Sequence, residues 1–446
     1  MGEPAALAGA RVLVCGFGVA GRTAAAALTA LGADVVVTAD KPVAERPDAR
    51  VGLTAVPDGI DLLVASPGYP PHHPLLTDAV ARGIAVWGEV ELAWRLRGEH
   101  AAPWLALTGT NGKTTTVHML EAVLRAAGLR AAAVGNVGES LIDAVVSGRH
   151  DVLAVELSSQ QLHFAPSIRP AAGALLNLAP DHLSWHGSLE AYEQAKAAIF
   201  GADVAIANAD DARVTALAPS GAVTFTLGEP GAGALGVRDG RLVSHAFGDD
   251  GAVLAEVAEV RPAGRHNVAN ALAAAALARA HGVPAEAVGA GLRAFEPDPH
   301  RNALVTERDG VAWVDDSKAT NPHAADASMS SYERIVWIAG GQLKGVEIDD
   351  LVRAHAGRLA GAVLLGVDRG LIAAALSRHA REVPVITVDT DDDGAMIEVV
   401  RAASGLARPG DTVLLAPAAA SYDMFAGFGA RGDAFAAAVH ALDGPA

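Results

Sequence analysis

The chain has 446 residues, enough for several domains of roughly 150 residues each. Hydrophobic residues make up 51% of it, which excludes a disordered chain, and polar residues interrupt every apolar stretch well before the ~18 residues of a membrane span. The formal net charge of −17 argues against a general nucleic-acid-binding protein, because phosphate backbones are bound by basic patches. The single cysteine, Cys15, excludes an internal disulfide, and the N-terminus lacks the basic and apolar segments of a secretory signal. We therefore expect a protein of the reducing cytoplasm.

Short runs of Val, Ile and Leu alternate with alanine-rich segments of helical period along most of the chain. This alternation predicts βαβ units, and hence an α/β fold with parallel sheets buried on both faces. Polar or glycine-rich turns after such runs divide the chain into three predicted domains at 1–97, 98–298 and 299–446. The expected strands are Arg11–Cys15, Asp34–Thr38, Asp61–Ala65, Trp104–Leu107, Val152–Glu156, Gly173–Asn177, Val311–Val314, Ile335–Ile338, Ala362–Leu365 and Val413–Leu415. A valine-studded, glycine-rich segment at 222–260 predicts antiparallel hairpins in the central domain, and the proline-rich segment 296–300 predicts a linker.

The segment Thr108-Gly-Thr-Asn-Gly-Lys-Thr114 follows a predicted strand and precedes a predicted helix. A glycine turn at a helix N-terminus presents backbone N–H groups to a polyphosphate, and the helix dipole favours the anion. Lys113 would then contact the outer phosphates and the Thr114 hydroxyl would ligate Mg²⁺. The strict P-loop has a glycine where this chain has Leu107, so the match is partial. The alternative is a tight turn with a solvent-exposed lysine.

A second glycine turn, Gly16-x-Gly18-x-x-Gly21, follows the first predicted strand. The dinucleotide fingerprint also requires an acidic residue at the end of the second strand, and Asp40 lies near that place without matching it. A nicotinamide cofactor, another diphosphate such as that of a UDP-sugar, and close packing of helix on strand remain open for this turn.

Three further groups lie after predicted strands or on a helix of the central domain. Glu156 ends a strand and could reach a metal ion at the phosphate loop, although a strand-end glutamate is more often solvated or capping. His182, in Asp181-His182, is a candidate metal ligand, although a lone histidine is more often a satisfied surface or core group. Lys196 lies in a strongly helix-forming segment, where the ordinary interpretation is a solvated lysine paired with Glu193.

Asn267 and Asn270 share a helix face and suit the edge of a nucleobase, although an asparagine at a helix start is more often a cap. In the last domain, Asp315-Asp316-Ser-Lys318-Ala-Thr320-Asn and Gly340-Gly-Gln-Leu-Lys344 each follow a strand. Cationic side chains at strand ends suit a substrate that bears carboxylates.

In this order and spacing the motifs resemble the Mur ligase family over almost the whole chain, from about Val12 to Phe435. The matching segments are Gly109–Thr114, Glu156-Leu-Ser-Ser, Asp181-His182, Lys196, His266-Asn267-x-x-Asn270, His300-Arg301 and 315–321. The last of these, with the tail Ala420-Ser421-Tyr-Asp423, Phe428 and Arg431-Gly432, is similar to the member of the family that adds D-glutamate.

The resemblance implies an N-terminal Rossmann-like domain for the UDP substrate, a central P-loop ATPase-like domain with a parallel sheet and a small antiparallel sheet, and a C-terminal Rossmann-like domain for the amino acid. It implies an ATP-dependent, ADP-forming ligase of peptidoglycan synthesis, cell-wall biogenesis and cell division. Its substrates would be UDP-N-acetylmuramoyl-L-alanine and D-glutamate, joined through an acyl phosphate. It also implies two Mg²⁺ ions, a carbamylated Lys196, a cytoplasmic monomer, and neither nucleic acid nor membrane as a partner.

The residue roles carried over from the resemblance fall into four groups. Lys113, Glu156, His182 and Lys196 would be catalytic, with Thr114, Glu156, His182 and Lys196 as metal ligands. ATP would be bound by Gly109, Thr110, Asn111, Gly112, Lys113, Thr114, Thr115, Asn267, Asn270, Arg301 and Asp316. The UDP substrate would contact Gly16, Gly18, Ser66, Pro67, Gly68, Asn136, Ser158 and Gln161. D-glutamate would contact Lys318, Thr320, Lys344, Ser421 and Phe428.

This chain departs from the family pattern at two places. The second strand ends in Thr38-Ala39-Asp40, which leaves the residue that meets uracil undetermined. Gly341-Gln-Leu-Lys344 keeps the lysine of the last domain but lacks its usual acidic neighbour. The alternatives are a sister Mur ligase or a folylpolyglutamate synthase-like ligase for another amino acid, a nicotinamide dehydrogenase and a non-catalytic nucleotide-binding regulator.

Overall fold

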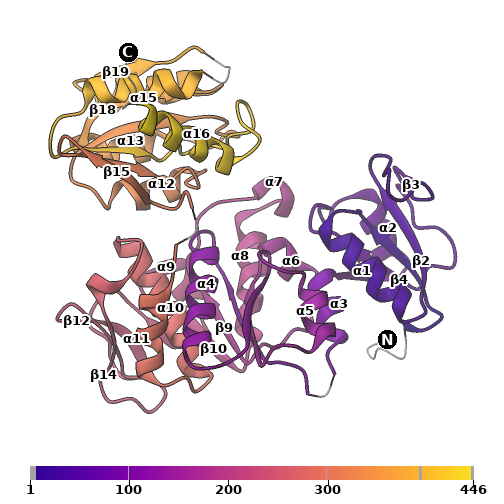
Figure 1. Ribbon diagram of the computed structural model, residues 1–446. Coiled ribbons are helices and arrows are strands. Elements are labelled where there is room, and N and C mark those ends of the chain that lie inside the picture. The colour runs from indigo at the N-terminus through magenta and orange to yellow at the C-terminus, as the bar shows by residue number, and fades with distance from the viewer. Residues whose placement is uncertain (1–6, 99, 298, 391–393, 443–446) are drawn as a thin grey trace. The chain divides into compact units, whose positions relative to one another are not determined.

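The computed structural model describes residues 7–98, 100–297, 299–390 and 394–442. The chain forms two compact units, one from residues 1–259 with 269–295 and the other from residues 260–268 with 296–446. Three separate sheets, each with helices packed on it, make up these units (Figure 1). The predicted three-domain α/β architecture is therefore confirmed, whereas the boundaries at 97/98 and 298/299 stay a prediction. Residue 298, within the expected linker, lies outside the described residues.

The N-terminal sheet has five parallel strands in the order β3-β2-β1-β4-β5. They are β1 (Arg11–Cys15), β2 (Asp34–Ala39), β3 (Arg50–Val51), β4 (Leu62–Ala65) and β5 (Ala85–Gly88), joined by α1 (Val19–Ala30), α2 (Pro74–Ala81) and α3 (Glu89–Arg95). From Val12 to Cys15 the central strand is fully buried, as expected for a parallel strand covered on both faces. From β1 the chain first adds β2 and β3 on one side of the sheet and then β4 and β5 on the other. At this switch point the carboxyl ends of β1 and β4 border a crevice.

The central sheet has nine strands in the order β14-β13-β12-β11-β10-β9-β6-β8-β7. The strands from β7 to β12 along this order are parallel, and β12, β13 and β14 are antiparallel hairpins that extend the same sheet beyond β11. The strands are β6 (Trp104–Thr108), β7 (Ala131–Gly135), β8 (Val152–Glu156), β9 (Ala172–Leu175), β10 (Val204–Asn208), β11 (Val223–Phe225), β12 (Ala234–Arg238), β13 (Arg241–Ser244) and β14 (Ala252–Glu256). The hairpins expected at 222–260 are thus present.

The helices around this sheet are α4 (Lys113–Ala126), α5 (Leu141–Ser147), α6 (Ser159–His163), α7 (Leu183–His186), α8 (Leu189–Ala197), α9 (Ala212–Leu217), α10 (Arg265–Ala280) and α11 (Ala285–Ala294). One hydrophobic core runs through both the N-terminal and the central sheets. It includes Trp104, and the partly buried Trp94 packs edge to face against it, with ring centres 5.0 Å apart. This shared core explains why the first two predicted domains form a single compact unit.

The C-terminal sheet has six strands in the order β15-β16-β20-β17-β18-β19, and β15 is antiparallel to the rest. The elements are β15 (Ala303–Arg308), β16 (Val311–Asp315), β17 (Ile335–Gly340), β18 (Leu359–Leu365), β19 (Val385–Thr387) and β20 (Thr412–Leu415), with α12 (Pro322–Met329), α13 (Asp349–His355), α14 (Arg369–His379), α15 (Ala395–Leu406) and α16 (Phe428–Ala441). Separate apolar cores lie on its two faces. Among the described residues, none of the helices is long and apolar enough to span a bilayer.

Candidate active site

The phosphate loop joins β6 to α4 at the middle of the central sheet. Gly112 has φ of 82°, a left-handed conformation that favours glycine, and it caps the N-terminus of α4. An added Cβ there would lie 2.4 Å from Asn270 Oδ1, so the position has no space for a side chain. Lys113 Nζ donates to the carbonyl oxygens of Gly109 and Thr110, each at 2.9 Å. The turn therefore leaves its lysine folded over the loop, at the place where a polyphosphate would lie.

Two residues that the sequence analysis missed hold this loop. Asn177, after β9, accepts from Asn111 N with its side-chain oxygen at 2.8 Å and donates to Asn111 O at 3.0 Å. Tyr192, on α8, lies 2.8 Å from Thr110 through their hydroxyl groups. The sequence analysis placed Asn177 at the end of the expected strand Gly173–Asn177, whereas β9 ends at Leu175. Its role became clear only from the sheet order, which puts β9 beside β6.

Glu156 ends β8, the strand beside β6, and is paired with Leu107 in the register. The residue is 1% exposed. Its Oε1 accepts from Asn136 Nδ2 at 2.8 Å, while Oε2 is buried without a hydrogen-bond partner. A buried carboxylate oxygen that lacks a donor costs free energy unless a cation or ligand satisfies it. The site therefore fits a hard cation such as Mg²⁺ at the phosphate loop.

Lys196 lies on α8 and is only 2% exposed, so the interpretation of a solvated helix lysine is wrong. Its amine donates to Gly109 O at 2.8 Å and to Thr108 Oγ1 at 3.2 Å. Burial and the nearby charge of Lys113 lower its pKa well below the usual range, against the opposing effect of Asp181 and Glu156. The fold thus brings Lys113, Glu156 and Lys196 to one edge of the central sheet.

His182 lies in the exposed segment before α7 and has a left-handed backbone with φ of 51°. Its Nε2 is 3.6 Å from Asp181 Oδ2. Across the described ranges of the chain, no three His, Cys, Asp or Glu side chains converge on a common metal position. Glu156 and the hydroxyl of Thr114 suit an ion that takes further oxygen ligands from bound phosphates, as Mg²⁺ does.

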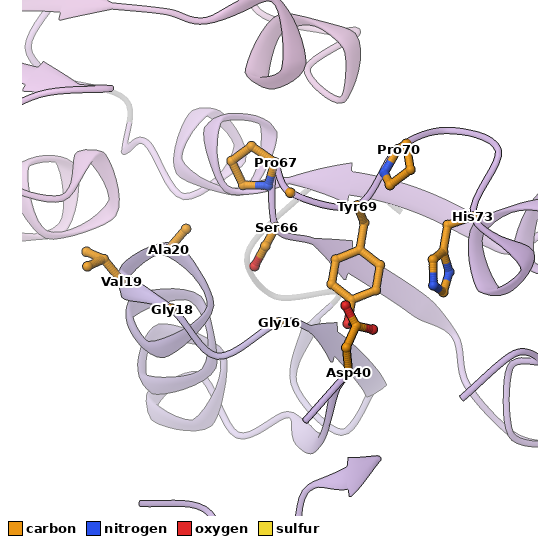
Figure 2. Close-up of a pocket in the computed structure, with 11 residues that line it drawn as sticks. Gly16, Gly18, Val19, Ala20, Asp40, Ser66, Pro67, Tyr69, Pro70 and His73 are labelled. Carbon is orange, nitrogen blue, oxygen red and sulfur yellow. The ribbon is translucent and has the colours of Figure 1, made fainter. Parts of the chain in front are cut away.

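A pocket of about 420 Å³ opens at the crevice of the N-terminal sheet. Figure 2 shows that the glycine turn after β1 and the loop after β4 form its walls, with Asp40 and Tyr69 side by side. The Tyr69 hydroxyl donates to Asp40 Oδ1 at 3.1 Å. The pocket contains all five residues predicted there for a UDP diphosphate, namely Gly16, Gly18, Ser66, Pro67 and Gly68.

Two glycines of this turn differ in the space around them, which gives a matched pair of variants. A Cβ at Gly21 would lie 1.9 Å from Gly16 O, whereas a Cβ at Gly18 would meet nothing within 4 Å. We expect Gly21→Ala to lower the free energy of unfolding by about 1–3 kcal/mol, as overpacking does, and to weaken UDP binding. Gly18→Ala should leave stability unchanged. Thermal unfolding measures the stability of each variant, and titration with UDP measures its binding. Equal stability of the two variants would contradict this expectation.

An aromatic cluster joins the pocket to the phosphate-loop side of the central sheet. Trp185 Nε1 donates to Pro67 O at 3.1 Å, and its ring contacts that of His186. The ring of His186 in turn packs edge to face against Tyr192, the residue that holds Thr110. The loop after β4 is therefore connected by direct contacts to the phosphate loop, a connection that spacing along the sequence could not reveal.

The predicted substrate contacts after β8 are engaged in local structure. Ser158 and Gln161 form a capping box at the start of α6: Ser158 Oγ accepts from Gln161 N at 3.1 Å, and Gln161 Oε1 accepts from Ser158 N at 2.9 Å. Gln161 Nε2 donates to Glu89 Oε1 at 2.7 Å, and burial raises the pKa of that carboxyl group. Similarly, one bond of Asn136 fixes Glu156. The bonds of these three residues therefore hold Glu156 and the start of α6 in place.

The predicted adenine and ATP contacts are divided between the two units. Asn270 belongs to the first unit and lies against Gly112, whereas Asn267, Arg301 and Asp316 belong to the second. Asp316 accepts from Asn302 N at 3.2 Å, and burial raises the pKa of its carboxyl group to about 6.

The residues predicted to bind the amino acid follow three neighbouring strands, β16, β20 and β17. Lys318 Nζ lies 3.8 Å from the centre of the Phe428 ring, and Ser421 is buried. Lys344 is exposed, with φ of 55°. The fold thus gathers Lys318, Thr320, Lys344, Ser421 and Phe428 at the carboxyl edge of the C-terminal sheet.

Comparison with known proteins places these features in a family. The model of the Mur ligase middle domain matches residues 107–278, and that of the Mur ligase glutamate ligase domain matches residues 300–419. The chain is 54% identical to a UDP-N-acetylmuramoylalanine--D-glutamate ligase of Streptomyces coelicolor, over 98% of this chain and 99% of that protein.

The chain belongs to the Mur ligase family.

A protein of Thermobifida fusca with the same name is 53% identical over 98% of this chain and all of its own length. Among solved structures, a UDP-N-acetylmuramate-alanine ligase of Thermotoga maritima has a TM-score of 0.60 at 18% identity, covering 97% of this chain and 100% of its own. A pseudomurein peptide ligase of Methanothermus fervidus has a TM-score of 0.57 at 18% identity, covering 91% and 96%. These structures share the Mur ligase fold. As a Mur ligase the protein is an ATP-dependent, ADP-forming enzyme that uses Mg²⁺, which excludes a dehydrogenase and a non-catalytic regulator.

Proposed function

We propose that this Mur ligase joins D-glutamate to UDP-N-acetylmuramoyl-L-alanine, with cleavage of ATP to ADP and phosphate. The observation that carries the proposal is the gathering of Lys113, Glu156 and the buried amine of Lys196 at the phosphate loop. Two relatives that are more than half identical over nearly their full lengths carry the name of this activity. The enzyme would act in the cytoplasm as a monomer, with the UDP substrate bound by the first domain, ATP by the central domain and D-glutamate by the last.

ATP would lie with its phosphates on the turn from Gly109 to Thr115, where the N-terminus of α4 and Lys113 offset their charge. Asn267 and Asn270 would contact adenine, and Arg301 and Asp316 the rest of the nucleotide. Thr114 and Glu156 would hold one Mg²⁺ ion, and His182 and carbamylated Lys196 would hold a second. The two ions would supply the charge neutralisation that phosphoryl transfer needs. The alanyl carboxylate attacks the γ-phosphorus, ADP leaves, and an acyl phosphate forms.

The second step joins the two substrates. The amine of D-glutamate attacks the acyl carbon, and phosphate leaves as the amide forms. Lys318, Thr320, Lys344, Ser421 and Phe428 would hold D-glutamate so that its amine is within reach of the acyl carbon. The pocket of the first domain, with Asn136, Ser158 and Gln161, would hold the UDP substrate.

The environment of Lys196 supports the proposed carbamylation. A neutral amine attacks the carbon of CO₂ and loses a proton, which gives a carbamate anion. The ammonium form cannot do this because it lacks a lone pair. Burial beside Lys113 lowers the pKa of the Lys196 amine and thereby favours the reactive form. The product has the charge and the oxygen donors that a metal ligand needs.

The direct test measures phosphate release from ATP with UDP-N-acetylmuramoyl-L-alanine, Mg²⁺ and one amino acid at a time. We expect release with D-glutamate and not with L-glutamate, L-alanine or meso-diaminopimelate. Release with a different amino acid would make the protein a sister Mur ligase. Release with a folate substrate instead of the UDP substrate would indicate a folylpolyglutamate synthase-like ligase.

A further inference from the structure

A buried arginine, Arg431, lies in the first turns of α16. Its side chain is 1% exposed, although arginine is almost never fully buried unless its charge is paired. Within the described part of the chain, its hydrogen bonds all go to neutral oxygens and none to a carboxylate. The guanidinium group therefore binds backbone and hydroxyl oxygens of the fold and forms no hydrogen-bonded ion pair with a described carboxylate.

The guanidinium group connects three strand ends. Nε donates to Ser317 Oγ at 3.0 Å and Nη2 to Ser317 O at 2.9 Å, directly after β16. Nη1 donates to Gly340 O at 3.3 Å, at the end of β17, and to Ala419 O at 3.2 Å, after β20. The planar fork of arginine provides the separate donors that this arrangement needs, whereas lysine would present its donors from one point.

The same three strand ends carry the residues proposed to bind D-glutamate. Lys318 directly follows the Ser317 anchor, Ser421 lies two residues after Ala419, and Lys344 lies four residues after Gly340. Ser317 Oγ also donates to Phe428 O at 2.8 Å, so the bond network reaches the last proposed contact. One buried side chain therefore joins the backbone of every segment that would touch the amino acid.

The charge of Arg431 is retained at neutral pH. Burial lowers the pKa of its guanidinium to about 10, while the nearby carboxylates of Asp423 and Asp315 raise it. D-glutamate arrives with two carboxylates, and a cation behind the loops that receive it is electrostatically favourable.

We propose that Arg431 is a positioning residue for the amino-acid substrate: its fork sets the relative places of the three strand-end loops that hold D-glutamate. This inference rests on the proposed function and adds a residue that acts through others. Because Arg431 acts on these loops, its loss affects the second chemical step and leaves the first intact.

The test compares Arg431→Met, which removes the fork and the charge, with Arg431→Lys, which keeps only the charge. We expect Arg431→Met to raise the KM for D-glutamate by roughly 10- to 100-fold, the size of effect that displaced binding groups produce. Arg431→Lys should reverse less than half of this increase in the logarithm of the KM for D-glutamate. The KM for the UDP substrate should stay within about twofold of the wild type, since Arg431 bonds to none of the residues proposed to bind that substrate.

The first step is measured separately with hydroxylamine, which attacks an acyl phosphate to give a hydroxamate and phosphate. With saturating ATP and no D-glutamate, we expect equal hydroxamate formation by wild type and both Arg431 variants. Trp337→Phe is the control: it removes the bond from Trp337 Nε1 to Ala416 O at 2.8 Å in the same sheet and leaves the Arg431 network intact. This variant should keep the wild-type KM for D-glutamate.

An unchanged KM for D-glutamate in Arg431→Met would overturn the inference, as would full restoration by Arg431→Lys, which would show that charge alone matters. If Arg431→Met does not fold, Arg431→Lys and Ser317→Ala are used for the test. A wild-type KM for D-glutamate in both of these variants would also overturn the inference. A wild-type protein that forms no hydroxamate or does not use D-glutamate would instead contradict the proposed function.

Discussion

Lys196→Ala should lose phosphate release by roughly 10³-fold, the upper range for removal of one preorganised electrostatic group. The amine is buried and bonded to Gly109 O and Thr108 Oγ1, so its removal leaves a space beside the phosphate loop. Added short carboxylates such as acetate should restore part of the activity, because they enter the space left by the side chain and supply the missing negative oxygens. Steady-state phosphate release, measured with and without acetate, checks both statements.

The Lys196 experiment has three controls. Lys196→Met fills most of the space and should not respond to acetate. Glu190→Ala changes an exposed residue of the same helix and should retain full activity. Depletion of CO₂ and bicarbonate should slow the wild type and leave the acetate-restored variant unaffected. Loss in Lys196→Ala without any response to carboxylates, together with a wild type insensitive to CO₂, would make Lys196 a structural residue.

Glu156→Gln should reduce kcat by roughly 10²–10³-fold and raise the Mg²⁺ concentration needed for half-maximal rate. The substitution is nearly isosteric. Its remaining oxygen can still accept from Asn136 Nδ2, whereas an amide nitrogen takes the place of the buried Oε2 that has no partner. An amide cannot ligate a cation through nitrogen in this way, so the change isolates one oxygen atom. Phosphate release over a Mg²⁺ titration measures the effect.

Glu139→Gln is the matched control for Glu156. Glu139 is a partly exposed carboxylate that pairs with His150 and Arg149 at the surface, and surface pairs contribute little. Its substitution should leave both kcat and the Mg²⁺ dependence unchanged. If Glu156→Gln lowers the melting temperature and kcat while the Mg²⁺ dependence stays at the wild-type value, the glutamate does not bind the metal.

Much of the chemistry was predictable because it lies in local segments. The glycine turns, Lys113, Glu156 and the lysine-bearing strand ends each follow a run of buried residues, and a turn after a parallel strand points to one edge of a sheet. Three α/β sheets and the ligand class followed from these patterns. The boundaries of the elements were close as well, since β1 and β8 coincide with the expected strands.

The strand order could not be predicted from local pattern. It brings Glu156 beside the phosphate loop and places Asn177 where its amide holds Asn111. Lys196 shows the limit most clearly: its helix has a polar sequence typical of a solvated surface, yet the lysine is buried against β6.

The sequence by itself determined the fold class, the family and the types of residues at each turn, because these depend on neighbours within a few positions along the chain. Only the tertiary structure decided which of these residues are buried, and which oxygen of Glu156 lacks a partner. It alone showed that Arg431 joins three loops separated by up to about a hundred residues. The physical reason is that burial and pKa depend on atoms brought together by strand order, and strand order is set by packing of the whole domain.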